Sequence, residues 1–176
     1  IAIIGVLAAI LVPSMLGYVR KSKISSANSA ASSVQKAFDS TLTDCDAKGI
    51  KLEFEGWLQI HSGVLSADWM NGSQADSSNF LEGLNNYFDK MKKVDGYAYV
   101  KNSACLAIVA TTDGTYIGTF PSGYVEAKDY KSNGALKGGS KAANLKTVAD
   151  RMKDDAEALD MTLNNGTASY APTAWT

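Results

Sequence analysis

The first nineteen residues carry no charged side chain, and this constrains the fold more than any other feature of the chain. The run IAIIGVLAAILVPSMLGYV ends abruptly at Arg20-Lys21-Ser22-Lys23. A helix of this length nearly spans a hydrocarbon core of about 30 Å, and a basic cluster is typical of the point where a chain leaves the bilayer. No comparable run follows. We therefore distinguish a hydrophobic segment, residues 1–22, from a globular head, residues 23–176, and expect at most one membrane crossing.

The same helix is predicted to continue past the basic cluster, where it becomes part of the head. Small and apolar residues recur there at steps of three and four, which places them on one side of a helix. No Gly or Pro interrupts residues 18–47, and Lys48-Gly49 is a suitable end. We expect one helix of about 45 residues, hydrophobic all round in its front half and amphipathic in its rear half. The apolar stripe of the rear half comprises Ala27, Ala30, Ala31, Val34, Ala37, Phe38, Leu42 and Cys45.

Two residues in the front half disfavour a regular helix. Pro13 lacks an amide donor and its ring clashes with the carbonyl of Ala9, at a cost of about 3 kcal/mol, and Gly5 adds backbone freedom. We expect the helix to loosen or unwind somewhere between Gly5 and Ser14. A plain proline kink is the alternative.

The head shows a clear pattern of short strands. The β-prone runs are Tyr97–Val100, Cys105–Thr111 and Thr115–Phe120. Asp113-Gly114 separates the last two, and such a pair favours a turn with positive φ. We predict an antiparallel meander of three or four strands whose apolar face packs on the long helix.

Helical patterns flank these strands. A helix is predicted over Asp76–Lys93, ended by Asp95-Gly96, and a final helix is predicted after the capping residue Ser140 and closed by Asn164-Asn165-Gly166. The segment EFEGWLQIHSG is strand-like. The fold class is therefore α+β: a long N-terminal helix packed on an antiparallel sheet head with additional short helices. The final helix carries Leu145, Val148, Met152, Ala156 and Leu159.

The chemistry-bearing residues do not assemble into a catalytic motif. His61 is the only histidine, and no nucleophile elbow or Gly-rich phosphate loop is present, so we predict no catalytic residues, no metal site and no cofactor. Seventeen basic and eighteen acidic residues give no general attraction to nucleic acid. Two acidic pairs, Asp44 with Asp46 and Asp154 with Asp155, lack the spacing of a calcium loop, and calcium binding in the head is a remote alternative. Asn71 and Asn165 match the glycosylation sequon.

The two cysteines, Cys45 and Cys105, lie at the end of the long helix and in a predicted strand. Outside the cytoplasm such a pair is interpreted as a disulfide, which would stabilise the head by about 4 kcal/mol through a loop of about 60 residues. Two buried thiols are the alternative.

The N-terminal third of the chain resembles the type IV pilins and the related pseudopilins. The specific match is IAIIGVLAAILVP followed by a tyrosine and basic residues, and it covers residues 1 to about 45. Gly5 and Pro13 match the family's helix-breaking glycine and proline. The head beyond Gly49 matches in layout only, and the family's early glutamate has no counterpart within residues 1–176.

The resemblance implies a structural subunit of a cell-surface filament, anchored in the cytoplasmic membrane before assembly and serving adhesion, motility or DNA uptake as a whole fibre. Its partners would be copies of itself, the inner-membrane assembly machinery, a prepilin peptidase and the membrane. In the filament the segment from Gly5 to Pro13 would unwind. A pseudopilin of a type II secretion system is the alternative, and a single-pass membrane-anchored enzyme or binding module is a remote one. The expected polymerisation core comprises Ile1, Ile3, Ile4, Val6, Leu7, Ile10, Leu11 and Val12.

Overall fold

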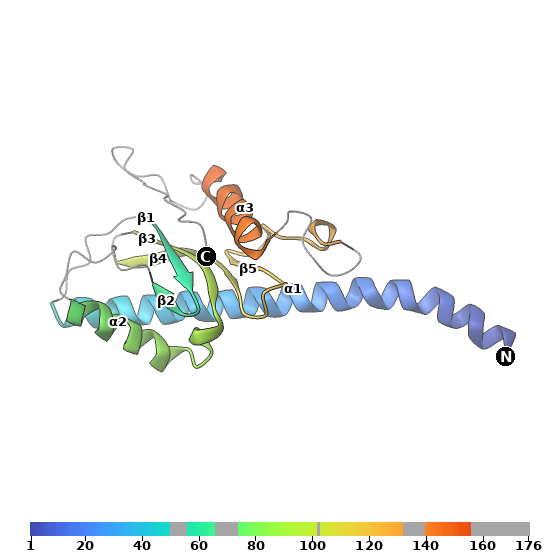
Figure 1. The fold of residues 1–176 in the computed structure, drawn as a ribbon, viewed down its shortest axis with the longest axis horizontal. Coiled ribbons are helices and arrows are strands. Elements are labelled where there is room, and N and C mark those ends of the chain that lie inside the picture. The colour runs from blue at the N-terminus through green and yellow to red at the C-terminus, as the bar shows by residue number, and fades with distance from the viewer. Residues whose placement is uncertain (50–55, 66–73, 102, 132–139, 156–176) are drawn as a thin grey trace.

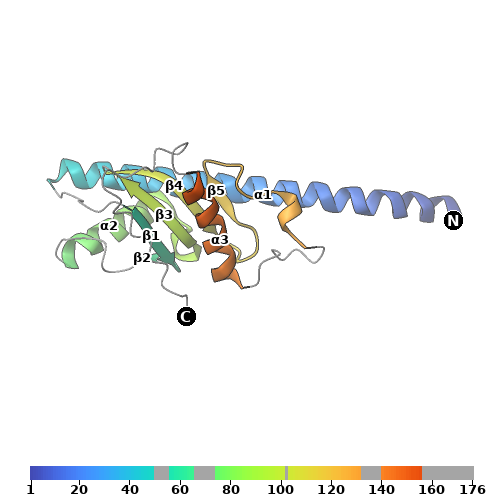
Figure 2. The same cartoon turned by 90° about the horizontal axis from the view of Figure 1, so that it is seen from above.

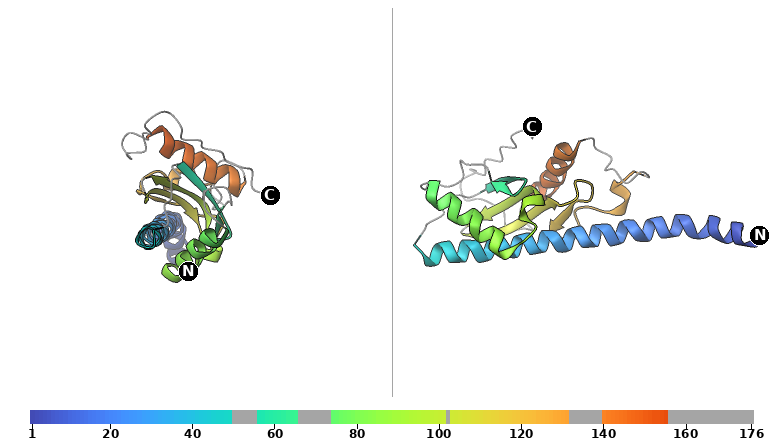
Figure 3. Two further views of the ribbon diagram at one scale, coloured as in Figure 1. Left: turned by 90° about the vertical axis from the view of Figure 1, so that its left-hand side faces the viewer. Right: turned by 60° about the horizontal axis from the view of Figure 1, so that its bottom comes forward.

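The computed structural model describes residues 1–49, 56–65, 74–101, 103–131 and 140–155. An antiparallel sheet separates two helical layers: the long helix α1 (Ala2–Ala47) and α2 (Gln74–Tyr87) cover one face, and α3 (Lys141–Asp154) covers the other (Figures 1 and 3). The predicted fold class, α+β with a long N-terminal helix packed on an antiparallel sheet, is confirmed.

Helix α1 is longer than the head that it supports. Its 46 residues end at Ala47, where the Lys48 amide donates to the Asp44 carbonyl and Gly49 adopts a φ of +75°. Only the rear half packs on the sheet, while the front half projects beyond the head as a single helical stem (Figure 2). The predicted length, end and division into two halves are confirmed. The buried residues of the rear half are Ile24, Ala31, Val34, Gln35, Ala37, Phe38, Thr41, Leu42 and Cys45.

The sheet has five strands in the order β2-β1-β3-β4-β5, and all pairs are antiparallel. The three predicted runs correspond to the last three strands, and the strand-like segment EFEGWLQIHSG supplies β1. The two-residue strand β2 adds the fifth strand, so the prediction of three or four was one short. The strands are β1 (Gly56–His61), β2 (Val64–Leu65), β3 (Asp95–Lys101), β4 (Ala104–Thr111) and β5 (Gly118–Phe120).

The loop between β4 and β5 follows the chemistry expected of an Asp-Gly pair. The Asp113 carboxylate accepts the amides of Thr115 and Tyr116, each at 2.9 Å, and Gly114 has a φ of +79°. The side chain of Asp113 thus stands in for a backbone acceptor. The connection runs from Thr112 to Ile117, longer than the two-residue turn that this pair most often forms.

The helix predicted over Asp76–Lys93 is shorter than expected. Helix α2 ends at Tyr87, and a separate 3-10 turn, η2 (Met91–Lys93), leads into the sheet. Asp95-Gly96, expected to stop the helix, instead begins β3. There an added Cβ on Gly96 would overlap the Val109 carbonyl of the neighbouring strand, so the glycine is needed for close strand approach rather than for a cap.

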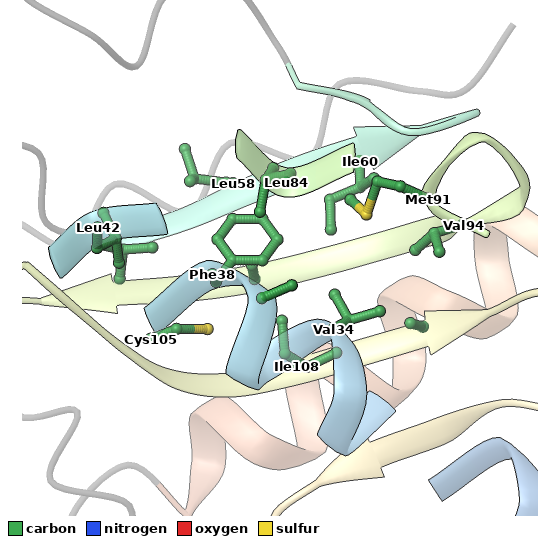
Figure 4. Packing of buried hydrophobic residues seen from close by; sticks show 14 of the residues in the cluster. Val34, Phe38, Leu42, Leu58, Ile60, Leu84, Met91, Val94, Cys105 and Ile108 are labelled. Carbon is green, nitrogen blue, oxygen red and sulfur yellow. The ribbon is translucent and has the colours of Figure 1, made fainter. Parts of the chain in front are cut away.

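Both faces of β3 and β4 are buried, which gives the head two cores. On the first face Phe38 of α1 packs edge to face on Phe80 of α2, with ring centroids 5.7 Å apart. Phe38 lies in the same cluster as Ile108 of β4 (Figure 4). On the second face Trp57 stacks edge to face on Tyr99, with centroids 5.4 Å apart, in the cluster that includes α3. The predicted packing of the sheet on α1 is confirmed, and the second core was not foreseen.

Helix α3 begins as predicted. The Ser140 hydroxyl accepts the Ala143 amide at 3.3 Å and caps the helix. Leu145, Val148 and Met152 are buried against the sheet. The remaining predicted positions, Ala156, Leu159 and the closing residues 164–166, lie outside the described residues.

Side chains of α1 also cap the edge of the sheet. Strand β5 pairs with β4 only over Ile108–Ala110, so the first half of β4 would otherwise expose backbone donors and acceptors. The Cys105 amide donates to the Asp39 carboxylate at 2.7 Å, and the Gln35 amide donates to the Cys105 carbonyl at 3.0 Å. Two helical turns before Gln35, the Asn28 side chain accepts the Thr119 amide at 3.0 Å. The helix therefore completes the sheet laterally as well as covering one face.

Candidate assembly surface

The front half of α1 is the most unusual surface of the molecule. All twelve large apolar side chains between Ile1 and Val19 are exposed. Soluble monomers rarely expose a contiguous apolar patch larger than a few hundred Å². Among the described residues, α1 is the one helix long and apolar enough, by length and composition, to cross a membrane. The eight residues expected to form a polymerisation core are among the twelve. Ile1 is fully exposed, and the other seven are between 54% and 76% exposed: Ile3, Ile4, Val6, Leu7, Ile10, Leu11 and Val12.

The front half has a narrow side made of small residues. Ala2, Gly5, Ala9 and Pro13 follow one another at steps of three and four, so they share one side of the helix. An added Cβ on Gly5 would meet no atom within 4 Å, so this side is open to the close approach of another helix.

The expected loosening between Gly5 and Ser14 does not occur in this structure, and the prediction is wrong for the isolated chain. Helix α1 continues through both helix-breaking residues, Gly5 and Pro13, without interruption. Pro13 withdraws only the one amide that would bond the Ala9 carbonyl, and the Gly5 amide still bonds the Ile1 carbonyl at 3.3 Å. The Ser14 hydroxyl donates to the Leu11 carbonyl at 3.1 Å. The flanking backbone bonds hold the helix.

The basic cluster marks the change from the stem to the head. Lys21 and Lys23 are exposed, while Arg20 is partly covered, and Ile24 is the first side chain buried against the sheet. The apolar stem and the charged surface of the head are therefore separated by one turn of helix. This is the order expected at a membrane interface.

A charged cluster that the sequence did not suggest links three elements of the head. Asp95, at the start of β3, accepts Lys141 of α3 at 2.6 Å and the Ser62 amide at 2.8 Å. His61 Nδ1 lies 3.4 Å from the same carboxylate. Because Asp95 is nearly buried, these donors replace its water. His61, predicted to be an ordinary strand or surface histidine, ends β1 with a half-exposed side chain, as expected.

The predicted disulfide is absent from the structure. Cys45 and Cys105 are both thiols, buried in the same core cluster. The Cys105 thiol is directed along its own strand, where it donates to the Ala107 carbonyl at 3.7 Å. Burial, together with the nearby Asp39 carboxylate, raises the pKa of this thiol well above its ordinary value. It is therefore held as the protonated form, which is the poorer nucleophile for disulfide exchange.

The other candidate residues do not converge. Among the described residues no group of three or more His, Cys, Asp or Glu side chains could hold a metal ion. Asp44 accepts the Tyr87 hydroxyl at 2.7 Å, and Asp155 accepts the Tyr124 hydroxyl. Both sequon asparagines lie outside the described residues.

Comparisons of the chain with protein-family models, with curated proteins and with solved structures found no match. The long apolar N-terminal helix followed by an antiparallel sheet is compatible with a pilin-like architecture. The arrangement joins an uncovered apolar stem to a head with its own two-sided core. Such a molecule is suited to anchoring in lipid and to association through the stem.

Proposed function

We propose that this protein is the structural subunit of a type IV pilus-like filament, which polymerises through the apolar front half of α1. The observation that carries the proposal is the stem itself, in which all residues from 1 to 19 are exposed although they are the most apolar part of the chain. A surface of this kind is stable only in lipid or against other apolar surfaces. Lipid surrounds the stem before assembly, and a bundle of stems from other copies surrounds it afterwards.

The transfer from lipid to such a bundle is physically reasonable. Both environments exclude water, so the stem loses little hydrophobic stabilisation when it leaves the bilayer. The narrow side with Ala2, Gly5 and Ala9 lets helix backbones approach closely, which strengthens van der Waals packing. Stems that point the same way but are offset along a common axis meet through different surfaces, so the contact is heterologous. A repeated heterologous contact that does not close gives an open helical filament.

The proposal includes the setting in which such a subunit works. The chain is anchored in the cytoplasmic membrane by its stem, processed by a prepilin peptidase and assembled by inner-membrane machinery into a cell-surface fibre. These partners come from the resemblance of residues 1 to about 45 to the type IV pilins. Adhesion, motility or DNA uptake would be a property of the whole fibre.

The test is assembly of the full chain after removal of detergent, followed by electron microscopy and helical reconstruction. Leu11→Lys places a charge in the middle of the stem, where it costs about 2.5–3.5 kcal/mol in an apolar environment. Leu11 contacts no part of the head, so the head should fold as in the wild type while filaments disappear. Leu11→Met is the matched control, since it conserves volume and apolar character, and should assemble normally.

Three results would contradict the proposal. The wild-type chain could stay monomeric in lipid vesicles under every assembly condition, which would leave the stem as an anchor only. Filaments could form equally well with Leu11→Lys, which would place the stem outside the fibre core. A reconstruction with the stems on the outer surface would have the same meaning.

A further inference from the structure

A groove runs along the flank of α1 that faces α2. Its first part, of about 880 Å³, is lined on α1 by residues from Tyr18 to Ser33 and on the other side by residues 86–90 and the β4–β5 loop. Its second part, of about 230 Å³, is lined by residues from Thr41 to Lys48 and by α2 residues including Glu82. Asn86 and Tyr87 line both parts, so the two are continuous. The groove opens where the apolar stem begins.

The wall of the groove on α1 is formed mainly by small side chains. Between Tyr18 and Ser33 it consists mainly of serine and alanine, apart from Val19 and Lys23. Ser29 and Ser33 donate their hydroxyl protons to carbonyls one turn back, which makes the surface less polar than its composition suggests. Small side chains whose polar groups are satisfied permit the close approach of another helix, even an apolar one.

The charges along α1 are strongly polarised. Its middle carries Arg20, Lys21 and Lys23 with no acidic residue among them, while its end carries three acidic residues, from Asp39 to Asp46, before Lys48. The end of a helix is where the macrodipole disfavours negative charge, and the last turn of α1 contains no basic residue. Glu82 of α2 lines the same part of the groove as Asp44 and adds a further carboxylate. Among the described residues, Lys48 is the one basic residue that lines this part, so its two carboxylates can accept a further cation from outside the chain.

We propose that a second, parallel copy of this chain docks in the groove, shifted along α1 so that its Lys21 and Lys23 meet Asp44 and Glu82 of the first. The shift corresponds to 22 residues of helix, or about 33 Å. The same shift places residues 2–11 of the second copy beside residues 24–33 of the first, along the serine and alanine wall. One displacement thus satisfies two contacts, an ionic one and an apolar one.

The inference rests on the proposed function and adds to it the surface that receives the next subunit. Parallel orientation follows from a shared membrane, in which all stems point the same way. The contact joins different surfaces on the two copies and leaves each free to receive another, so it extends into a fibre. Asp89, Lys90 and Asp113 also line the first part of the groove, and all three are exposed.

The test is a charge-swap experiment on the full chain in the detergent-removal assay. Lys21→Glu with Lys23→Glu, and Asp44→Lys with Glu82→Lys, should each reduce filament yield at least tenfold. The four substitutions together should restore the yield to within about threefold of wild type, because the opposite charges meet again. The control is Lys146→Glu with Lys153→Glu on exposed positions of α3, on the far side of the sheet. It changes the net charge as much as the reversal of Lys21 and Lys23 does, and it should leave assembly unchanged.

A cross-link gives the second arm of the test. Lys23 and Asp44 are about 32 Å apart on one helix, so a disulfide between Lys23→Cys and Asp44→Cys forms only between copies. Mild oxidation of filaments of this double variant should give a ladder of covalent oligomers, while either single variant should give none beyond dimers. The two native thiols are buried and serve as an internal background.

The outcomes separate the two proposals. If the wild type assembles but the reversed variants assemble equally well, or the fourfold variant fails to recover while its head unfolds at the wild-type temperature, the docking surface is wrong and the filament proposal stands. If intact filaments of the double-cysteine variant give no ladder of covalent oligomers on oxidation, the docking surface is likewise wrong and the filament proposal stands. If the wild type itself forms no filaments, both proposals fall.

Discussion

Substitution of Asp39 by alanine tests whether α1 completes the edge of the sheet. The carboxylate accepts the Cys105 amide at 2.7 Å and also accepts the Gln35 side-chain amide. Cys105 is only 2% exposed, so its amide has no access to water once Asp39 is gone. A hydrogen bond to a charged group contributes about 1.5–3 kcal/mol to stability. The better helix propensity of alanine offsets about 0.5 kcal/mol of that loss. We expect Asp39→Ala to cost about 1–2.5 kcal/mol.

The measurement is thermal and urea unfolding of the full chain in detergent, followed by near-ultraviolet circular dichroism. For a chain of this length the loss corresponds to about 2–10 °C in Tm. Amide hydrogen exchange should also show faster exchange at Cys105, while the core of β3 stays protected. Asp39→Asn keeps an oxygen acceptor and should lose less than half as much. Lys36→Ala, on the exposed side of the same helix, should stay within about 0.5 kcal/mol of the wild type.

Unfolding of Asp39→Ala within about 0.5 kcal/mol of the wild type, with unchanged exchange at Cys105, would contradict this role of Asp39. Such a result would mean that the edge of β4 is satisfied without α1. Equal losses of unfolding free energy for Asp39→Ala and Lys36→Ala would lead to the same conclusion, because they would reflect helix propensity rather than the contact with Cys105.

Three further predictions concern the head. Gly118→Ala should cost at least about 2 kcal/mol, because its Cβ would overlap the Ala27 carbonyl; a Tm within 1 °C of wild type would contradict this. Lys141→Met should cost about 1–3 kcal/mol by leaving the Asp95 carboxylate short of its charged partner, and a double-mutant cycle with Asp95→Asn should show coupling. Stability should fall above about pH 8.5, by up to about 1.4 kcal/mol per pH unit, because the raised pKa of Cys105 keeps its thiol protonated only in the folded state. Cys105→Ala should flatten that slope between pH 9 and 10, and an unchanged slope would exclude this thiol as its source.

The sign of the alkaline effect follows from where each state holds its proton. Below the unfolded-state pKa both states are protonated and stability is complete. As pH rises towards the folded-state pKa, the unfolded thiol ionises first and draws the equilibrium to the unfolded side. Tyr130 adds a second contribution at higher pH, since burial raises its pKa to about 12.

Features that depend on neighbouring residues could be predicted from the sequence. The length of α1, its end at Lys48-Gly49 and its division at the basic cluster follow from helical periodicity and from charge. The positive φ of Gly114 and the Ser140 cap follow from the chemistry of single residues. The apolar stem needed no structure at all, because nineteen residues without a charge already demand a dry environment.

Other features were decided only by tertiary contacts. Gln35, Asp39 and Asn28 look like ordinary polar residues of an amphipathic helix, and only the tertiary structure shows that each also bonds the backbone of the sheet. The second core under α3 was hidden because strands buried on both faces lose the alternation that marks a single face.

The errors have the same origin. Pro13 is a helix breaker by local rules, yet the bonds on either side of it hold α1 together in the isolated chain. Cys45 and Cys105 are suitable partners by position in the sequence, but the packing around β4 directs the Cys105 thiol along its own strand. The sequence thus determined which surfaces must avoid water and which segments are helical. The tertiary structure decided which polar and sulfur groups meet, because those meetings depend on distances between residues that lie far apart in the chain.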